Sequence, residues 1–285
     1  MKQITIHAHA KVNLTLSVGA KRPDGYHAVE TVMTGVSLSD TVTLTRCAEG
    51  EDTLLCAAPM TQRPEDDLTM RALATFFRET GITREDAVTI ALEKRIPAQA
   101  GLGGGSSDAA AVLRGLRVLY APHITDDELE RMAALLGSDV PYFIRGGTAL
   151  ATGRGEVMTA LPAMPRCAFV IVKPEESYST AAMYAAIDSA DVVRTGDSDA
   201  VQQGLRTGDL AMIAAGVDND FQRVLPTGSA VPAIVDALLA HGALCAQMTG
   251  SGSAVFGIYA GRQEAERSAA ALRETYPHIF YADAV

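Results

Sequence analysis

The sequence predicts an α+β fold of two domains, an N-terminal mixed α/β domain with a glycine-rich phosphate loop and a C-terminal ferredoxin-like α/β sandwich. Its 285 residues exceed the usual size of one domain and allow two compact cores. In the first half, a glycine-rich stretch from Pro97 to Asp108 stands between a strand pattern and a helix pattern. In the second half, strand and helix patterns alternate up to the C-terminus.

The first expected element is a long strand with one buried face. From Ile4 to Val18 the even-numbered residues are apolar and the odd-numbered ones are polar, which is the period of a half-buried strand. Side chains at i and i+2 share a face, so Lys11 and Asn13 project together and could meet one ligand. Periodicity alone allows a solvated polar face equally well. The Pro23–His27 segment, with its Asp-Gly step, predicts a tight turn.

The rest of the N-terminal half is predicted to combine short strands with helices. We expect strands at 32–36, 42–45 and 88–92, and helices at 68–79, after the glycines through 116, and at 125–136. The last helix opens with Thr125-Asp126-Asp127-Glu128, which is a capping box. A Gly/Thr-rich hairpin follows at 146–159. Pro162 and Pro165 then indicate a boundary, so we expect domains at 1–162 and 163–285.

The C-terminal half is predicted to form the sandwich. The expected strands are 168–172, 244–248, 254–259 and 279–282, and the expected helices are 180–187, 200–215, 230–241 and 263–276. A glycine turn at 249–253 joins the two middle strands. This order of elements is typical of a ferredoxin-like fold.

The glycine-rich stretch has the composition of a phosphate cradle. Glycine lets backbone N–H groups approach an anion without interference from a Cβ, and the following helix offers unpaired N–H groups and its positive end. A Walker-A loop would need a lysine where Ser106 stands, and a dinucleotide fingerprint would need a third glycine there. An ordinary flexible loop is disfavoured, because we expect a well-capped, amphipathic helix to follow the glycines directly.

Asp139 is a candidate general base. It lies between Gly137, which is expected to end a helix, and a Val-Pro step followed by two aromatic residues. This setting predicts a fixed backbone and partial desolvation, which suit a group that accepts a proton. A turn Asp that bonds its own backbone is the alternative.

Composition and charge exclude several classes of protein. The formal net charge is −10, which disfavours nucleic-acid binding. No apolar run approaches the roughly 20 residues of a membrane-spanning helix, and the start lacks the apolar core of a signal peptide, so we expect a cytoplasmic protein without membrane contact. Four scattered cysteines predict reduced thiols. His7 and His9 have no third ligand nearby in sequence, so no metal-ligating residue is assigned.

Motifs in sequence order resemble a known family of kinases. The loop Gly101–Ser107 is similar to that of the superfamily that includes galactokinase, homoserine kinase, mevalonate kinase and phosphomevalonate kinase. The segments Ala10-Lys11-Val12-Asn13-Leu14, Arg22-Pro23-Asp24-Gly25-Tyr26-His27 and Gly137-Ser138-Asp139-Val140-Pro141 extend the likeness to the 4-diphosphocytidyl-2-C-methyl-D-erythritol kinases. Further matching segments at 151–156, 179–184, 219–221 and 248–253 carry the resemblance over nearly the whole chain.

The resemblance implies ATP-dependent phosphorylation of the 2-hydroxyl of 4-diphosphocytidyl-2-C-methyl-D-erythritol to the 2-phosphate, with Mg²⁺, in the non-mevalonate route to isoprenoid precursors. It implies that Lys11 and Asp139 are the catalytic pair and that Asn13 holds the erythritol part. Tyr26 and Tyr178 would stack on cytosine, His27 would bond its edge, and Thr180 would also bind substrate. The residues implied in ATP binding are Lys94, Pro97, Gly101, Leu102, Gly103, Gly104, Gly105, Ser106, Ser107 and Asp108.

Three positions depart from the family pattern. Family members usually have Asn where Asp67 stands and often where Asp108 stands, and Asp cannot donate a hydrogen bond as the amide does. Thr249 replaces a serine and keeps the hydroxyl. The expected partner is a small-molecule substrate, with the protein a monomer or weak homodimer. Another small-alcohol kinase, a nucleotide-binding regulatory module and a dinucleotide oxidoreductase remain as alternatives.

Overall fold

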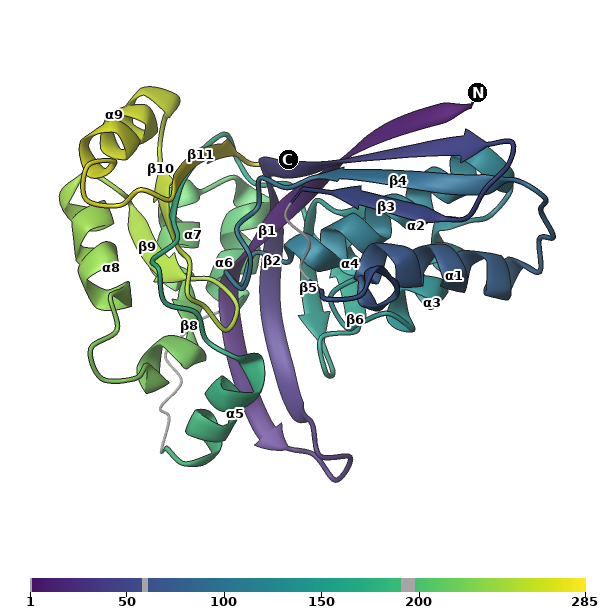
Figure 1. Ribbon diagram of the computed structural model, residues 1–285. Helices are drawn as coiled ribbons and strands as arrows, with labels where there is room; N and C mark the ends of the chain where they lie inside the picture. The colour runs from purple at the N-terminus through teal and green to yellow at the C-terminus, as the bar shows by residue number, and fades with distance from the viewer. Residues whose placement is uncertain (1, 58–60, 191–197) are drawn as a thin grey trace. The chain divides into compact units, whose positions relative to one another are not determined.

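The computed structural model describes residues 2–57, 61–190 and 198–285 (Figure 1). The chain forms two compact units, each made of separate stretches. Unit 1 comprises Met1–Ala10, Ser39–Ala98 and Gly103–Gly146, and unit 2 comprises Lys11–Leu38, Gln99–Leu102 and Gly147–Val285. The two long N-terminal strands and the glycine-rich stretch therefore contribute to both units. These units are discontinuous in sequence, and the predicted domain boundary after residue 162 stays a prediction.

Unit 1 is a sheet with helices packed beside it. The strand order is β3-β4-β2-β1, and β2 pairs with β4 in antiparallel register, with Val42 opposite Leu92. The strands are β1 (Gln3–Lys21), β2 (His27–Cys47), β3 (Thr53–Cys56) and β4 (Ala87–Glu93). The helices are α1 (Leu68–Thr80), α2 (Gly104–Tyr120), α3 (Asp126–Ala134) and α4 (Tyr142–Arg145), with a 3-10 turn at Pro64–Asp66. Phe76, Leu113 and Leu129 are fully buried in its core.

Several predicted elements of unit 1 differ from the observed ones. The two strands predicted at 32–36 and 42–45 are parts of the single strand β2, whereas β3 and α4 were not predicted. Helix α3 ends at Ala134, short of the predicted Leu136. Helix α2 begins at Gly104, so two glycines assigned to the loop lie in the first helical turn. The capping box at Thr125 is confirmed.

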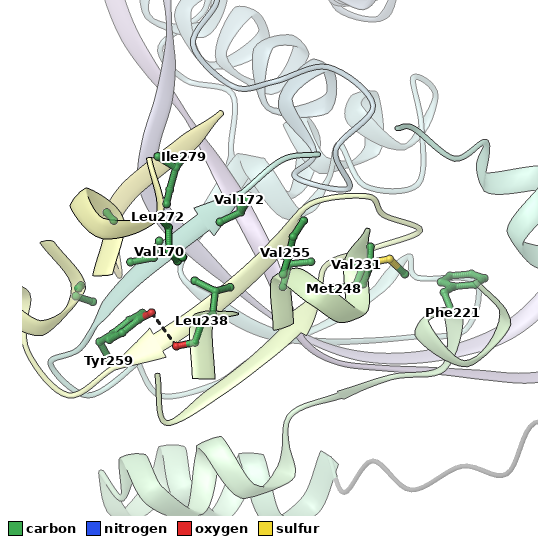
Figure 2. Packing of buried hydrophobic residues seen from close by; sticks show 14 of the residues in the cluster. Val170, Val172, Phe221, Val231, Leu238, Met248, Val255, Tyr259, Leu272 and Ile279 are labelled. Atoms are coloured by element: carbon green, nitrogen blue, oxygen red, sulfur yellow. Dashed lines mark hydrogen bonds between the residues drawn. The ribbon is translucent and has the colours of Figure 1, made fainter. Parts of the chain in front are cut away.

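Unit 2 contains the predicted ferredoxin-like sandwich. Its strands lie in the order β11-β7-β10-β9, and every neighbouring pair is antiparallel. The strands are β7 (Ala168–Val172), β9 (Cys245–Met248), β10 (Val255–Tyr259) and β11 (Ile279–Asp283), with α8 (Val231–Ala240) and α9 (Arg262–Leu272) packed on the sheet. Figure 2 shows the core between them, where Val170, Val255 and Leu238 meet and the Tyr259 hydroxyl donates to Leu238 O. Chain order and strand order together are those of a ferredoxin-like fold.

The remaining elements of unit 2 surround this core. The predicted hairpin is formed by β5 (Thr148–Thr152) and β6 (Val157–Ala160), and β8 (Asp218–Asn219) pairs with β1. The predicted helix at 180–187 is α5 (Thr180–Asp188). The single helix predicted at 200–215 is two helices, α6 (Ser198–Thr207) and α7 (Leu210–Gly216), because Gly208 is left-handed and Asp209 caps α7. Helix α9 ends at Leu272, before the predicted Tyr276.

Within the described residues, no helix is both long enough and apolar enough to span a bilayer.

Candidate active site

Lys11 and Asn13 form the centre of a polar cluster in unit 2. Lys11 Nζ donates to Asn13 Oδ1 at 2.5 Å and to Gly101 O at 2.6 Å. Asn13 Nδ2 donates to Thr31 Oγ1 at 2.8 Å, and Asn13 N donates to Thr249 Oγ1 at 3.0 Å. Both Lys11 and Asn13 are only 3% exposed. Their shared strand face is confirmed, and the alternative of a solvated face is wrong.

The start of the glycine-rich stretch touches the glycine turn after β9. Gly101 has φ of +75°, and a Cβ built there would lie 2.0 Å from Thr249 O, so only glycine fits. Asn219 Nδ2 holds the turn by donating to Met248 O and Gly250 O at 2.7 and 2.9 Å. The Thr249 hydroxyl also donates to Asn13 Oδ1 at 3.2 Å. Two glycine segments far apart in sequence therefore frame the Lys11 ammonium.

The second part of the stretch opens helix α2 in unit 1. Its N-cap is Gly103 at φ +73°, and no side chain of the described residues caps the helix, so the expected well-capped start is wrong. The first backbone bond is Ser107 N to Gly103 O at 2.9 Å, and the Ser107 hydroxyl donates to His9 O at 2.7 Å. The N–H groups of residues 104–106 precede that first bond and have the geometry of an anion site.

Lys94 lies just after β4 and joins two carboxylates in unit 1. Its Nζ donates to Asp40 Oδ2 at 2.5 Å and to Asp108 Oδ2 at 2.6 Å. Asp40 Oδ1 also accepts from the N–H groups of Arg95 and Ile96, at 2.5 and 2.8 Å. A Cβ at Gly104 would lie 3.5 Å from Lys94 Nζ, so the ammonium lies against the first turn of α2. We name Lys94, Asp40 and Asp108 the lysine–dicarboxylate cluster.

Burial shapes the protonation of this cluster. Burial raises the pKa of Asp108 to about 7, the attraction of Lys94 opposes this, and the neighbouring Asp40 carboxylate adds to it. Burial lowers the pKa of Lys94, but its pairs with Asp108 and Asp40 outweigh this and raise the pKa. Asp108 Oδ1 is buried, and no donor among the described residues reaches it.

Asp139 lies in unit 1, in the turn between α3 and α4. The predicted partial desolvation is wrong, because Asp139 is exposed although Val140, Tyr142 and Phe143 beside it are buried. The turn is fixed by backbone bonds from Val140 N to Gly137 O and from Phe143 N to Val140 O. Lys11 belongs to unit 2, so the pairing of Lys11 with Asp139 stays a prediction.

His27 and Tyr26 lie at the start of β2, in unit 2. The buried His27 ring stacks on Tyr184 with centroids 5.0 Å apart, and its Nε2 lies 2.7 Å from Asp188 Oδ1. Tyr26 is 57% exposed, and the Arg154 guanidinium lies 5.1 Å from its ring centroid. An exposed aromatic ring beside a held imidazole is a surface on which a flat, polar ring could stack.

Tyr178 and Thr180 lie near the glycine turn in unit 2. The Tyr178 hydroxyl donates to Glu176 and lies 2.8 Å from Ser229 Oγ, and a Cβ at Gly252 would lie 2.8 Å from the Tyr178 ring. Burial and the bond to Glu176 raise the pKa of Tyr178 to about 12. Thr180 Oγ1 and Ser251 Oγ are 3.0 Å apart. The predicted stacking of Tyr178 on cytosine stays a prediction.

The other predicted ATP-binding residues flank the two halves of the loop. Leu102 is buried, and its carbonyl accepts from Lys11 N at 3.1 Å. Pro97 and Ser106 are half-buried, and Gly105 is exposed in the first turn of α2. Asp67 is the N-cap of α1 and accepts from Thr69 N at 2.9 Å, a role in which Asp serves as well as Asn.

Sequence reasoning missed Asp40 and Asp188. Asp40 is 0% exposed and stands in the apolar register of β2, between buried Leu38 and Val42. A carboxylate at an inward-facing position was the signal that could have found it. Asp188 stands four residues after Tyr184 in α5, on the same helix face, and bonds both His27 and Lys21.

Comparison with known proteins places this geometry in a family. Residues 67–147 match the GHMP kinases N terminal domain, and residues 201–278 match the GHMP kinases C terminal domain. The chain is 42% identical to the 4-diphosphocytidyl-2-C-methyl-D-erythritol kinase of Moorella thermoacetica, over 97% of both chains. It is 39% identical to the protein of the same name from Brevibacillus brevis, over 98% of this chain and 95% of that one.

Solved structures agree with this assignment. A crystal structure of 4-(cytidine 5'-diphospho)-2C-methyl-D-erythritol kinase superposes with a TM-score of 0.84 and 32% identity, covering 99% of each chain. The L. major mevalonate kinase in complex with R-mevalonate shares the fold, with a TM-score of 0.76 at 17% identity, covering 99% of this chain and 96% of that one. The chain is thus a GHMP kinase, a phosphotransferase. Within that class it belongs to the 4-diphosphocytidyl-2-C-methyl-D-erythritol kinase family.

Proposed function

We propose that this protein transfers the γ-phosphoryl group of ATP to the 2-hydroxyl of 4-diphosphocytidyl-2-C-methyl-D-erythritol, in the non-mevalonate route to isoprenoid precursors. The products are the 2-phosphate and ADP. Relatives of this name match nearly the full chain. The observation that carries the proposal is the buried Lys11 ammonium, which lies between Asn13 and the Gly101 carbonyl at the start of the glycine-rich stretch.

ATP would bind through its phosphates at the open start of α2. The N–H groups of Gly104, Gly105 and Ser106 precede the first helical hydrogen bond, and no described side chain caps them. They can therefore donate to an anion, and the helix dipole adds to the attraction. Lys94, Pro97, Gly101, Leu102, Gly103, Ser107 and Asp108 would shape this part of the site.

Mg²⁺ would enter with ATP and offset the charge of its phosphates. The described residues contain no group of three His, Cys, Asp or Glu side chains placed to hold a metal ion. This fits an ion that is bound chiefly by phosphate oxygens and water, which is a common mode for Mg²⁺. No protein ligand is assigned to it.

In the reaction, the 2-hydroxyl oxygen attacks the γ-phosphorus as the bond to the bridging oxygen of ADP breaks. The hydroxyl proton passes to the Asp139 carboxylate, and the positive charge of Lys11 steadies the negative charge that develops on the transferring group. Asn13 would hold the erythritol part, since its amide lies within hydrogen-bonding distance of Lys11. Thr249 supports Asn13 from the glycine turn.

The cytidine would bind at Tyr26 and His27. In the tautomer whose Nε2 donates to Asp188, Nδ1 would be left as an acceptor, which suits the exocyclic amino group of cytosine. Tyr184 fixes the plane of the imidazole by stacking on it. Tyr26 and Tyr178 would supply aromatic faces, and Thr180 would contact the substrate near Ser251.

We further propose that the protein acts in the cytoplasm as a monomer or weak homodimer, without nucleic-acid or membrane partners. The net charge of −10 supports the lack of a nucleic-acid partner.

The proposed base is tested with Asp139→Asn. Loss of a general base lowers turnover by about 10²–10⁴-fold, while this exposed substitution should leave the unfolding midpoint unchanged. The measurement is ADP release with the cytidine diphosphate substrate, and the matched control is Asp236→Asn on the exposed face of α8. Turnover of Asp139→Asn close to that of the control would refute the role.

Substrate identity is tested separately by competition. Wild-type protein with ATP and magnesium should consume the cytidine-linked alcohol and leave homoserine and mevalonate unreacted. Preferential use of either small alcohol would overturn the substrate assignment while leaving the kinase class intact.

A further inference from the structure

The lysine–dicarboxylate cluster has one positive charge for two buried acids. Lys94 Nζ donates to both Asp40 and Asp108, which are 0% and 2% exposed. If both acids were ionised, the cluster would bury a net negative charge. Burying an unpaired charge is costly, so a proton on one carboxylate is favoured.

The hydrogen bonds show which acid takes the proton. Asp40 accepts three donors, from Lys94, Arg95 and Ile96, which is the environment of an ionised carboxylate. Asp108 accepts one, and its buried Oδ1 has no hydrogen-bond partner among the described residues, so no donor stabilises a negative charge there. We infer that Asp108 holds a proton on Oδ1 in the folded protein and acts, as a neutral acid, as a positioning residue for the phosphate-binding start of α2.

The surroundings of Asp108 support this assignment. The charged groups that act on it are Lys94, after β4, and Asp40, on β2, and burial raises its pKa to about 7. On β1, the carbonyl of the titratable residue His9 accepts from Ser107, which precedes Asp108 in the chain. Among the described contacts, no charged side chain of α1, α3 or α4 bonds or pairs with Asp108. A neutral Asp108 also matches the shape of Asn, with one oxygen free to accept from Lys94.

The proton matters for nucleotide binding because of where the cluster lies. Lys94 lies against Gly104, the first residue of α2, and Asp108 is one turn further along the same helix. An ionised Asp108 would add negative charge behind N–H groups proposed to hold phosphate. ATP should therefore bind better to the protonated form, and binding should in turn raise the proton affinity of Asp108. This second step rests on the proposed function, whereas the protonation itself does not.

The protonation is tested on the nucleotide-free protein. Asp108 is identified in the carboxyl ¹³C spectrum as the resonance absent from Asp108→Asn, and its midpoint should lie near pH 7, well above the ordinary Asp value of about 4. The exposed Asp236, identified in the same way with Asp236→Asn, is the control. A midpoint for Asp108 near that of Asp236 would overturn the inference.

Unfolding gives a second readout. Since the folded form holds the proton up to about pH 7 and the unfolded chain loses it near pH 4, wild type loses stability as pH rises across that window. The urea midpoint of Asp108→Asn should exceed that of wild type by a margin that grows from about pH 4 to about pH 7 and then stays constant. A margin independent of pH would contradict the protonation.

Nucleotide binding is measured with a non-hydrolysable ATP analogue and magnesium between about pH 6 and pH 8. Wild type should lose about three- to tenfold more affinity than Asp108→Asn over this range, because the titration of the analogue itself is common to both. Equal pH profiles would overturn the coupling between the proton and the nucleotide. Absence of binding in both proteins would instead refute the phosphate site, and the carboxyl titration would still decide the proton.

Discussion

Lys11 is buried and Lys94 is half-buried, and their ammonium groups have different hydrogen-bond acceptors. The Lys11 ammonium in unit 2 donates to an amide oxygen and a backbone carbonyl, whereas the Lys94 ammonium in unit 1 donates to the Asp40 carboxylate and to a second acid, Asp108. Neutral acceptors orient an ammonium without cancelling its charge. Carboxylates neutralise it.

This difference separates two uses of the same side chain. A charge that neutral groups hold in place can still act on a phosphoryl group, which favours Lys11 as the catalytic lysine. A charge shared by two acids holds structural elements together, which favours Lys94 as the residue that joins β2, the end of β4 and α2. The two proposed roles follow the hydrogen-bond acceptors that the structure describes for each lysine.

Removing the Lys94 charge should have the largest effect on stability. Lys94→Met leaves Asp40 and Asp108 without their cation, and breaking a buried pair costs about 3–5 kcal/mol in the free energy of unfolding. The loss should shrink as pH falls through about 7, because Asp108 then takes up a proton and no longer needs a cation. Urea unfolding at several pH values measures it, with exposed Lys2→Met as the control. A cost below about 1 kcal/mol would show that the ion pairs of Lys94 contribute no more to stability than exposed salt bridges do.

Removing the Lys11 charge should act on turnover. Lys11→Met keeps much of the volume and removes a donor aimed at developing charge, for which about 10²–10³ in kcat is typical. Loss of the bonds to Asn13 Oδ1 and Gly101 O should also lower the free energy of unfolding. Single-turnover kinetics measure the effect on turnover, and urea unfolding measures the effect on stability. If Lys11→Met and Lys94→Met lowered kcat equally, after correction for the fraction of folded protein, the proposed difference between the two lysines would be wrong.

Removing the Thr249 hydroxyl should have the smallest effect on turnover of the three changes. It tests whether the support of Asn13 by Thr249 helps to orient Lys11. Thr249→Val leaves Asn13 N without its acceptor, which costs about 1–3 kcal/mol, and should lower kcat by loosening Asn13. Thr249→Ser keeps the hydroxyl and should stay within about 0.5 kcal/mol of wild type. Calorimetric unfolding and kcat are the measurements. Equal behaviour of the two variants would show that the hydroxyl has no part in the site.

Local chemistry predicted much of the fold and part of the site. The alternation of β1 predicted that Lys11 and Asn13 share a face, and Thr125 and Glu128 predicted the capping box. The glycine content of 101–105 predicted a close backbone approach, which Gly101 makes to Thr249. These features depend on spacings of a few residues, which a sequence displays directly.

Features that depend on distant partners were not predictable in this way. β2 was predicted as two strands at 32–36 and 42–45, yet its partners β4 and β5 pair with different parts of one strand. Asp139 was expected to be partly desolvated from its apolar neighbours, but their side chains turn inward and leave it exposed. Asp40 and Lys94 are 54 residues apart, and no local pattern joins them.

The N-terminus of α2, which has no side-chain cap, links the stability of the folded protein to ligand binding. Helices α1, α3, α5 and α7 each begin with a side chain that accepts from an early N–H group, whereas α2 begins on Gly103 without one. An acceptor from outside the chain, such as water or the phosphate of the proposed nucleotide, would take its place. On the proposed function, phosphate binding would complete the hydrogen bonds of this first turn and would stabilise the folded protein.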